Sequence, residues 1–168
     1  MATTAKTKAG DDTKFQPRNA FLLAQLGAHA TTLFAARIAA LDLTPPEAGL
    51  LRIVATEPGL SQQAIAGRLG TPPSRLVLLV DGLEGRRVIE RRRNPEDRRN
   101  HALHLTAEGG RLMGQLGRAA AAHEEAVCAV LEADERSQLG ALLQRVAASH
   151  GLATGVHPGF TARGGGAC

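Results

Sequence analysis

The residues with the most obvious chemistry lie between positions 86 and 99, in the stretch RRVIERRRNPEDRR. This stretch holds seven arginines against three acidic residues, a net charge of +4. The formal net charge of the whole chain is also +4, so the other 154 residues sum to zero. A local run of guanidinium groups suits the binding of a polyanion such as nucleic acid. A solvated hairpin that resists edge-to-edge aggregation has the same composition, and charge alone does not decide between the two.

The composition predicts one domain built mainly from helices. Hydrophobic residues make up 43% of the 168 residues, yet there are only four Phe and no Trp or Tyr. We therefore expect a core of Leu, Val, Ile and Ala, and a chain of this length can bury one such core. No run of 18 or more apolar residues and no apolar signal-peptide core occurs, so a cytoplasmic protein without a membrane partner is expected.

Two helices are predicted in the first third of the chain. Apolar residues at helical spacing indicate a long helix over residues 18–41. The second helix has explicit start signals, because Thr44 suits the N-cap, Pro45 suits the first helical position and Glu47 completes a capping box. The dipeptide PG at positions 58–59 is expected to end it.

A pair of short helices separated by a glycine follows. Ser61 is expected to cap the first, which ends at Gly70, and Thr71 to cap the second, which opens with Pro72. Helical spacing predicts the inward-facing residues of the pair to be Ala64, Ile65, Leu69, Leu76, Leu79, Val80 and Leu83.

Two strands and two further helices complete the predicted order. The strands are VIERR at 88–92 and HALHL at 101–105, joined by an NPED turn. Thr106 is expected to cap a helix that reaches about Glu132, and Asp134 a last helix that ends near Val146. The remaining segments, 1–17 and 150–168, lack periodicity and are expected to be a flexible arm and a Gly-rich flexible tail.

This order of elements predicts a mainly α winged helix-turn-helix fold with a small β-hairpin wing. The turn between the short helices needs a residue that tolerates positive φ, which Gly70 provides. The helix from Pro72 is then expected to enter the major groove of DNA, with Ser74 and Arg75 at the base edges. A bidentate contact from Arg75 to guanine is worth roughly 1–3 kcal/mol of discrimination between bases. Taken alone, Arg75 is more typical of an ordinary surface arginine, and the order of elements around it favours the DNA contact.

Three stretches resemble a known family, the MarR-type winged-helix transcription regulators. They are LTPPEAGLLRIVA, LSQQAIAGRLGTPPSRLVLLVDGLE and VIERRRNPEDRRNHALHLTAEG, and the likeness extends over residues 20–146. The last stretch resembles the wing of the family, whose pattern is D-R-R, five residues, L-T, two residues and G. Here that pattern begins at Asp97, continues at Leu105 and Thr106, and ends at Gly109.

The resemblance implies a homodimer that binds a pseudo-palindromic operator in double-stranded DNA. It implies a domain at 18–149, with a DNA-binding lobe at about 44–105 and dimerisation helices at about 18–41 and 106–149. Most members are repressors, and many release DNA when a small aromatic or lipophilic effector binds. A cytoplasmic, nucleoid-associated bacterial protein is therefore expected.

The resemblance also implies individual roles in DNA binding. Arg99 is expected to enter the minor groove, braced by Asp97, and Arg98 to touch a phosphate. The arginines at 91–93 are expected to supply a positive field along the base of the wing. The complete set of predicted DNA-contacting residues is Ser61, Gln62, Thr71, Ser74, Arg75, Arg86, Asp97, Arg98 and Arg99.

The predicted recognition helix departs from the family pattern. Val77 and Leu78 stand where relatives commonly carry polar residues, and Gly82 stands where a charge is frequent. Fewer side chains are therefore available to read bases directly. The two apolar residues are expected either to pack against the wing or to contact thymine methyl groups.

A few residues are candidates for binding an effector or a metal ion. The helices that line the pocket of the family carry His29, Arg37 and Arg52, which suit an anionic ligand. Cys128 is expected to be a buried structural thiol. His101 and His104 lie on opposite faces of a strand, so no metal site or other cofactor is expected.

Enzyme motifs such as a P-loop, G-x-G-x-x-G or G-x-S-x-G are absent from the sequence, so a catalytic role is not expected. Two alternatives to an effector-controlled repressor stay open. One is an architectural DNA-binding protein, and the other is a ligand-independent regulator that acts through protein partners.

Overall fold

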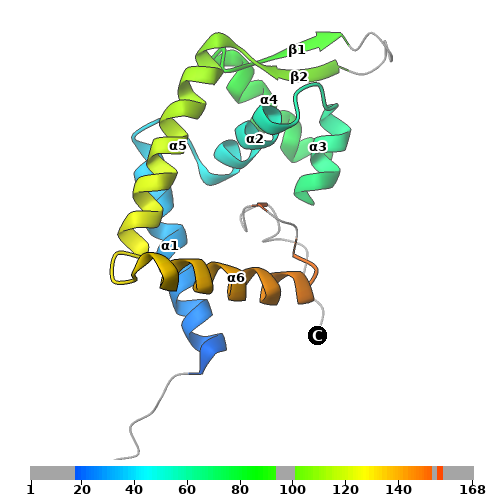
Figure 1. Ribbon diagram of the computed structural model, residues 1–168. Helices are drawn as coiled ribbons and strands as arrows, with labels where there is room; N and C mark the ends of the chain where they lie inside the picture. The colour runs from blue at the N-terminus through cyan, green and yellow to red at the C-terminus, as the bar shows by residue number, and fades with distance from the viewer. Residues whose placement is uncertain (1–17, 94–100, 153–154, 157–168) are drawn as a thin grey trace, which may run out of the picture.

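A computed structural model describes residues 18–93, 101–152 and 155–156 (Figure 1). Within these ranges the chain forms helices and one antiparallel sheet of two strands, as the predicted mainly α winged-helix fold requires. The predicted arm at 1–17, the NPED turn and most of the predicted tail lie outside the described residues. In chain order the elements are α1 (Asn19–Ala39), α2 (Pro45–Thr56), α3 (Gln62–Leu69), α4 (Pro73–Gly85), β1 (Ile89–Arg93), β2 (His101–Leu105), α5 (Ala107–Val127) and α6 (Ala133–Ser149).

Side-chain caps start several helices where the sequence predicts them. The Thr44 N–H donates to Glu47 Oε2 at 2.8 Å, and the Glu47 N–H donates back to Thr44 Oγ1 at 3.4 Å, which confirms the capping box of α2. The Ala64 N–H donates to Ser61 Oγ at 3.2 Å, so the predicted cap of α3 is also confirmed. These bonds satisfy backbone N–H groups that have no partner inside the helix.

The core lies where α2, α3, α4 and the sheet meet. Its largest fully buried side chains are aliphatic, as the composition predicts, and are Ile38, Leu50, Leu51, Ile65, Leu69, Leu76, Leu83, Ile89, Leu103, Val54 and Val80. β1 pairs with β2 in a register that places Ile89 opposite Leu105. The Leu103 N–H donates to the carbonyl of Leu60 at 3.0 Å, which ties β2 to the α2–α3 connection. The wing is therefore attached to the helix-turn-helix through its backbone as well as its side chains.

Two predicted boundaries and one predicted buried residue in the DNA-binding half are wrong. The N-cap of α4 is Pro72, and Thr71 lies before it with its side chain buried. β1 begins at Ile89, one residue after the predicted start. In α3 the buried residues are Ile65, Ala66 and Leu69, whereas Ala64, which was predicted to face inward, is exposed.

The predicted boundary between the last two helices is also wrong. α5 ends at Val127, and α6 begins at Ala133 with Glu132 as its N-cap, so Asp134 lies inside the helix. The Glu132 N–H donates to Glu135 Oε2 at 2.9 Å. Glu132 thus occupies the N-cap position that was predicted for Asp134. Glu135, three residues later, reaches back to the N–H of this cap, as in a capping box.

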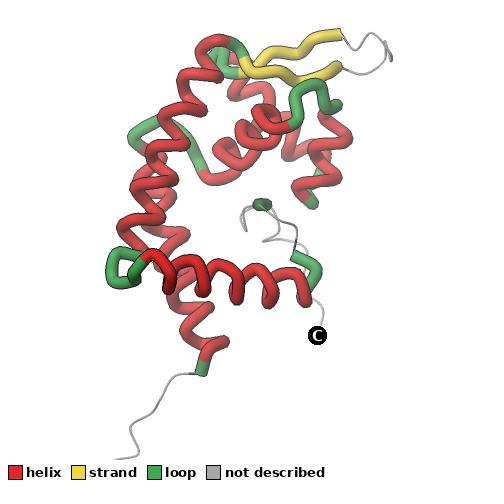
Figure 2. Tube along the Cα trace, viewed as in Figure 1, coloured by secondary structure: helices red, strands yellow, loops and turns green. Residues whose placement is uncertain are grey.

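Helices α1, α5 and α6 extend away from this core (Figures 1 and 2). The lobe formed by α2–α4 and the wing lies at one end of α5, and α6 lies at its other end, with α1 packed along α5. Ile38 is the buried residue of α1, and α6 buries none of its residues within the chain. Large apolar side chains on these helices, including Phe21, Leu26 and Leu142, are more than half exposed. None of the helices in the described ranges has the length and apolarity needed to cross a membrane.

Candidate nucleic-acid interface

The turn between α3 and α4 depends on one glycine. Gly70 has φ 59° and ψ 30°, the left-handed conformation that glycine adopts without steric cost. A Cβ at this position meets no atom within 4 Å, so the backbone angle rather than space requires glycine. The Thr71 N–H then donates to the carbonyl of Ala66 at 3.1 Å and closes the turn. This confirms the role predicted for Gly70 and fixes the direction in which α4 leaves the turn.

Helix α4 presents a mostly uncovered face to the outside of the lobe. Leu76, Val80 and Leu83 form its buried stripe. Ser74 is exposed and Arg75 is half-buried, with contacts of its own in the described chain. The two residues predicted to read bases thus lie in the first turn of α4.

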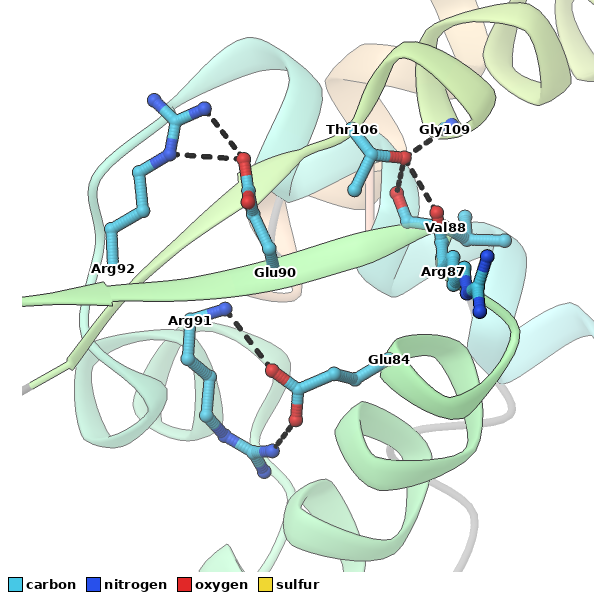
Figure 3. A network of polar contacts seen from close by, with 8 residues as sticks. All are labelled: Glu84, Arg87, Val88, Glu90, Arg91, Arg92, Thr106 and Gly109. Carbon is cyan, nitrogen blue, oxygen red and sulfur yellow. Dashed lines mark hydrogen bonds and ion pairs between the residues drawn. The ribbon is translucent and has the colours of Figure 1, made fainter.

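The base of the wing is joined to α4 by ion pairs (Figure 3). The Arg91 N–H donates to Glu84 Oε1 at 3.2 Å, and the Arg91 guanidinium donates to Glu84 and to Asp81. Partial burial lowers the pKa of Arg91. The hydrogen bond to Asp81 and the charges of Glu84 and Asp81 outweigh burial, so that the pKa of Arg91 lies above its ordinary value. Arg92 pairs with Glu90, whose Oε1 accepts from Arg92 Nη2 at 2.5 Å.

These ion pairs change the interpretation of the arginine-rich stretch. Two of the arginines expected to form a positive field along the base of the wing, Arg91 and Arg92, have their charges balanced by acids nearby. The base of the wing therefore offers a polyanion fewer unpaired positive charges than the charge count of the sequence indicates. The arginines at 98–99 lie outside the described residues.

The junction of the wing with α5 is built around Thr106 (Figure 3). Thr106 Oγ1 donates to the carbonyls of Arg87 at 2.6 Å and Val88 at 3.2 Å, and it accepts from the Gly109 N–H at 3.1 Å. A Cβ on Gly109 would lie 2.1 Å from the carbonyl oxygen of Val88. The L-T-x-x-G motif thus serves to seat the start of α5 directly on the strand entry, where only glycine fits.

Four of the predicted DNA-contacting residues are partly buried or bonded within the fold. Ser61 caps α3 and is half-buried, and Thr71 is buried with a hydroxyl that has no hydrogen-bond partner in the described part of the chain. Gln62 is half-buried at the start of α3, and its Nε2 also has no partner there. Arg86 donates from Nη1 to the carbonyl of Asp42 at 2.6 Å, so its guanidinium fastens the α1–α2 connection to the end of α4. No local pattern predicts this bond, because its partner is a backbone carbonyl distant in sequence.

The three residues predicted to bind an anionic effector lie on two helices, α1 and α2. His29 and Arg37 are exposed on α1. Arg52 on α2 donates to the carbonyl of Gly155, a contact between the lobe and the segment that follows α6. No hydrogen bond or ion pair joins any two of them in residues 18–93, 101–152 and 155–156.

Metal-binding and thiol chemistry find little support. In the described ranges no three His, Cys, Asp or Glu side chains are grouped as a metal site.

Cys128 is half-buried at the C-cap of α5, so the prediction of a buried thiol is wrong for the single chain. Burial, followed by the hydrogen bond to Glu124, raises the pKa of this thiol and disfavours its reactive thiolate form.

A glycine-turned helix pair beside a two-stranded wing defines a winged helix-turn-helix protein. Residues 41–100 match the model of the MarR family. The PcaV transcriptional regulator from Streptomyces coelicolor is 31% identical, and its crystal structure superposes with a TM-score of 0.65 over 81% of this chain and 100% of that one. The chain belongs to the MarR family.

Other similar proteins are also transcriptional regulators. A Thauera aromatica protein, named for transcriptional regulation of the hcr operon, is 35% identical over 62% of this chain and 63% of its own length. The match thus spans less than two thirds of that relative. The transcriptional repressor CouR, solved on a 23-mer DNA duplex, is 29% identical, with a TM-score of 0.69 over 85% of this chain and 99% of that one. A Mycobacterium tuberculosis MarR family protein, solved with salicylic acid, is 25% identical, with a TM-score of 0.63 over 78% and 97%.

Proposed function

We propose that this chain is a transcriptional repressor that binds a pseudo-palindromic DNA operator as a homodimer. The observation that carries the proposal is the arrangement of α4 beside the wing. The helix leaves the Gly70 turn with its outer face uncovered, and Arg91 holds the wing against it. A helix of this kind fits the major groove, which is about 12 Å wide, while the wing reaches the neighbouring backbone.

Within this proposal the candidate contacts fall into two groups. Ser74 and Arg75, in the first turn of α4, are proposed to meet base edges. Arg98 and Arg99 of the wing, together with Asp97, are proposed to act at phosphate and in the minor groove. Ser61 and Gln62 lie at the N-terminus of α3, where free N–H groups favour a phosphate. We assign Thr71 and Arg86 a structural part in the lobe, because one is buried and the other is bonded within the fold.

The exposed apolar helices support the homodimer. Phe21 and Leu26 on α1 and Leu142 on α6 are 55%, 56% and 55% exposed in the single chain. Large apolar side chains that are exposed on several helices of a single chain are commonly covered by another subunit. We therefore propose residues 44–105 as the DNA-binding lobe, with 18–41 and 106–149 as dimerisation helices, and an operator whose half-sites are about one helical turn apart.

Release by a small aromatic or lipophilic effector is proposed as the control of binding. Support comes from the salicylic acid complex of the similar Mycobacterium tuberculosis protein. In this chain Arg52, His29 and Arg37 provide cationic or hydrogen-bonding groups on α1 and α2. All three are exposed in the single chain, and we propose them as candidate contacts for an anionic effector.

The experiment that tests the proposal measures sequence preference. The full-length chain is incubated with fragments of its own genome in the presence of excess bulk DNA, and the retained fragments are sequenced and footprinted. A repressor is expected to prefer its operator by roughly 10³-fold or more over bulk DNA. Equal binding of all fragments would instead identify an architectural protein. Binding of no fragment at moderate salt would overturn DNA binding itself.

A further inference from the structure

Helix α4 exposes two apolar side chains on the face that points out of the lobe. Leu78 is 73% exposed and Val77 is 41% exposed. The buried stripe of α4 is formed by Leu76, Val80 and Leu83. At about 100° per residue, Leu78 projects nearly opposite that stripe, and Val77 lies about 90° from it. The strands of the wing that the structure describes therefore do not cover Leu78, and packing against them does not explain this residue.

The rest of the outer face is nearly bare. Ser74 precedes Leu78 by one helical turn and is small, and Asp81 follows with its carboxylate held by Arg91. A Cβ added at Gly82 or Gly85 meets no atom within 4 Å, so open space surrounds the helix beyond Leu78. The two apolar side chains are thus the largest groups that protrude from the middle of this face.

We infer that Val77 and Leu78 are specificity-determining residues that contact the C5-methyl groups of thymine in the major groove. The inference rests on the proposed DNA binding and adds the base that these residues select. An aliphatic side chain cannot hydrogen-bond to a base edge, and the thymine methyl is the apolar group that the major groove presents. Contact between the two removes apolar surface of both from water, which is favourable in proportion to the area.

The small size of this apolar patch suits DNA better than a protein partner. Asp81 lies near the same face and by itself would repel phosphates, and Arg91 offsets only part of that charge because Glu84 shares the same guanidinium. A specific protein interface buries about 800 Å² on each partner. Two apolar side chains flanked by glycines and polar residues offer far less apolar area than such an interface core requires.

The test removes the methyl group from the DNA and the side chain from the protein. The full-length chain first selects its operator from random duplexes. Binding is then measured to that operator and to a copy in which deoxyuridine, which lacks only the C5-methyl group, replaces thymine. The parent is expected to bind the copy about fourfold more weakly for each contacted methyl lost. In Leu78→Ala, and more so in Val77→Ala/Leu78→Ala, this penalty should shrink toward none.

The matched control is Val130→Ala, which shortens an apolar side chain that is 89% exposed in the α5–α6 connection. It should keep the full deoxyuridine penalty. An equal penalty in the parent and the double variant would mean that the methyl groups act through DNA shape, and would overturn the inference while leaving DNA binding intact. Equal affinity of the parent for both duplexes would also overturn it. Selection of no operator would overturn the proposed function and the inference together.

Discussion

Arg91 on β1 and Glu84 on α4 are joined twice, through the backbone N–H of the arginine and through its guanidinium (Figure 3). Asp81, nearly one turn earlier on α4, accepts from the same guanidinium. A single side chain thus spans two carboxylates of the helix and anchors the strand that leads into the wing. Because α4 and the wing would touch different grooves, this bridge fixes the geometry on which simultaneous contact depends.

Arg91→Ala is expected to weaken operator binding several-fold through loss of this geometry. The free energy of unfolding should fall by only about 1 kcal/mol or less, since both carboxylates are partly exposed. Fluorescence anisotropy with labelled operator measures the affinity, and urea unfolding measures the stability. The control is Arg92→Ala, which breaks an exposed pair with Glu90 on the same strand. Equal losses of affinity in the two variants would mean that charge alone matters and that the bridge has no positioning role.

Gly109→Ala is expected to destabilise the protein, whereas Gly110→Ala is expected to stabilise it. The new methyl at position 109 would lie 2.1 Å from the Val88 carbonyl oxygen, so the start of α5 must move off the strand, which costs about 1–3 kcal/mol. At position 110 a Cβ meets nothing within 4 Å, so alanine should gain roughly 0.5–1 kcal/mol of helix propensity. Urea unfolding of both variants checks the pair. Similar stabilities would contradict the close contact at Val88.

Local signals predicted the DNA-binding half of the fold because they act within a few residues. The Thr44 and Glu47 capping box, the Ser61 cap and the positive φ at Gly70 each depend on neighbours in sequence. Alternation between turn residues predicted the strands VIERR and HALHL, of which the second matches β2 and the first is shifted by one residue from β1. Periodicity predicted the long helices, but it did not predict that α5 ends at Val127 or that Glu132 is the N-cap of α6.

Tertiary contacts account for what the sequence could not predict. Arg86 was expected to face DNA, yet a carbonyl 44 residues earlier in the chain binds its guanidinium. Arg91 was expected to contribute to a positive field, yet acids on a separate helix balance its charge. The sequence showed Gly109 only as one position of a motif. Glycine is needed there because a side chain would collide with the carbonyl oxygen of Val88. Each of these effects depends on which segments the fold brings together.

Leu142→Glu is expected to dissociate the proposed homodimer. The parent chain should sediment at twice its 17.6 kDa mass, and a carboxylate placed in an apolar subunit contact should shift it toward the monomer because the charge loses its hydration. Val130→Glu is the matched control, since it places the same charge outside helices α5 and α6. Analytical ultracentrifugation distinguishes the two. A parent that sediments as a monomer, or a Leu142→Glu variant that stays dimeric, would contradict the assignment of this face.

Salicylate is expected to stabilise the protein and to weaken its DNA binding. A ligand present at a hundredfold excess over its dissociation constant adds about 2.7 kcal/mol to the free energy of unfolding, which a thermal-shift assay detects. His29→Ala and Arg52→Ala should reduce the shift, because each removes a group that can pair with a carboxylate. Arg145→Ala, an exposed arginine on α6, serves as the control. An unchanged shift in both variants would exclude these residues from the effector site.

Arg99→Ala is expected to weaken operator binding strongly and to lower its dependence on salt. Each arginine that no longer neutralises a phosphate reduces the slope of log affinity against log salt by about 1, so a dimer with two wings should lose about 2. Arg75→Ala should act differently, because loss of a base contact relaxes sequence preference by about 1–3 kcal/mol and leaves the slope nearly unchanged. Titrations at several salt concentrations, on the operator and on a variant with one half-site base changed, separate the two effects. If Arg99→Ala binds the operator like the parent at every salt concentration, the wing arginine has no part in recognition.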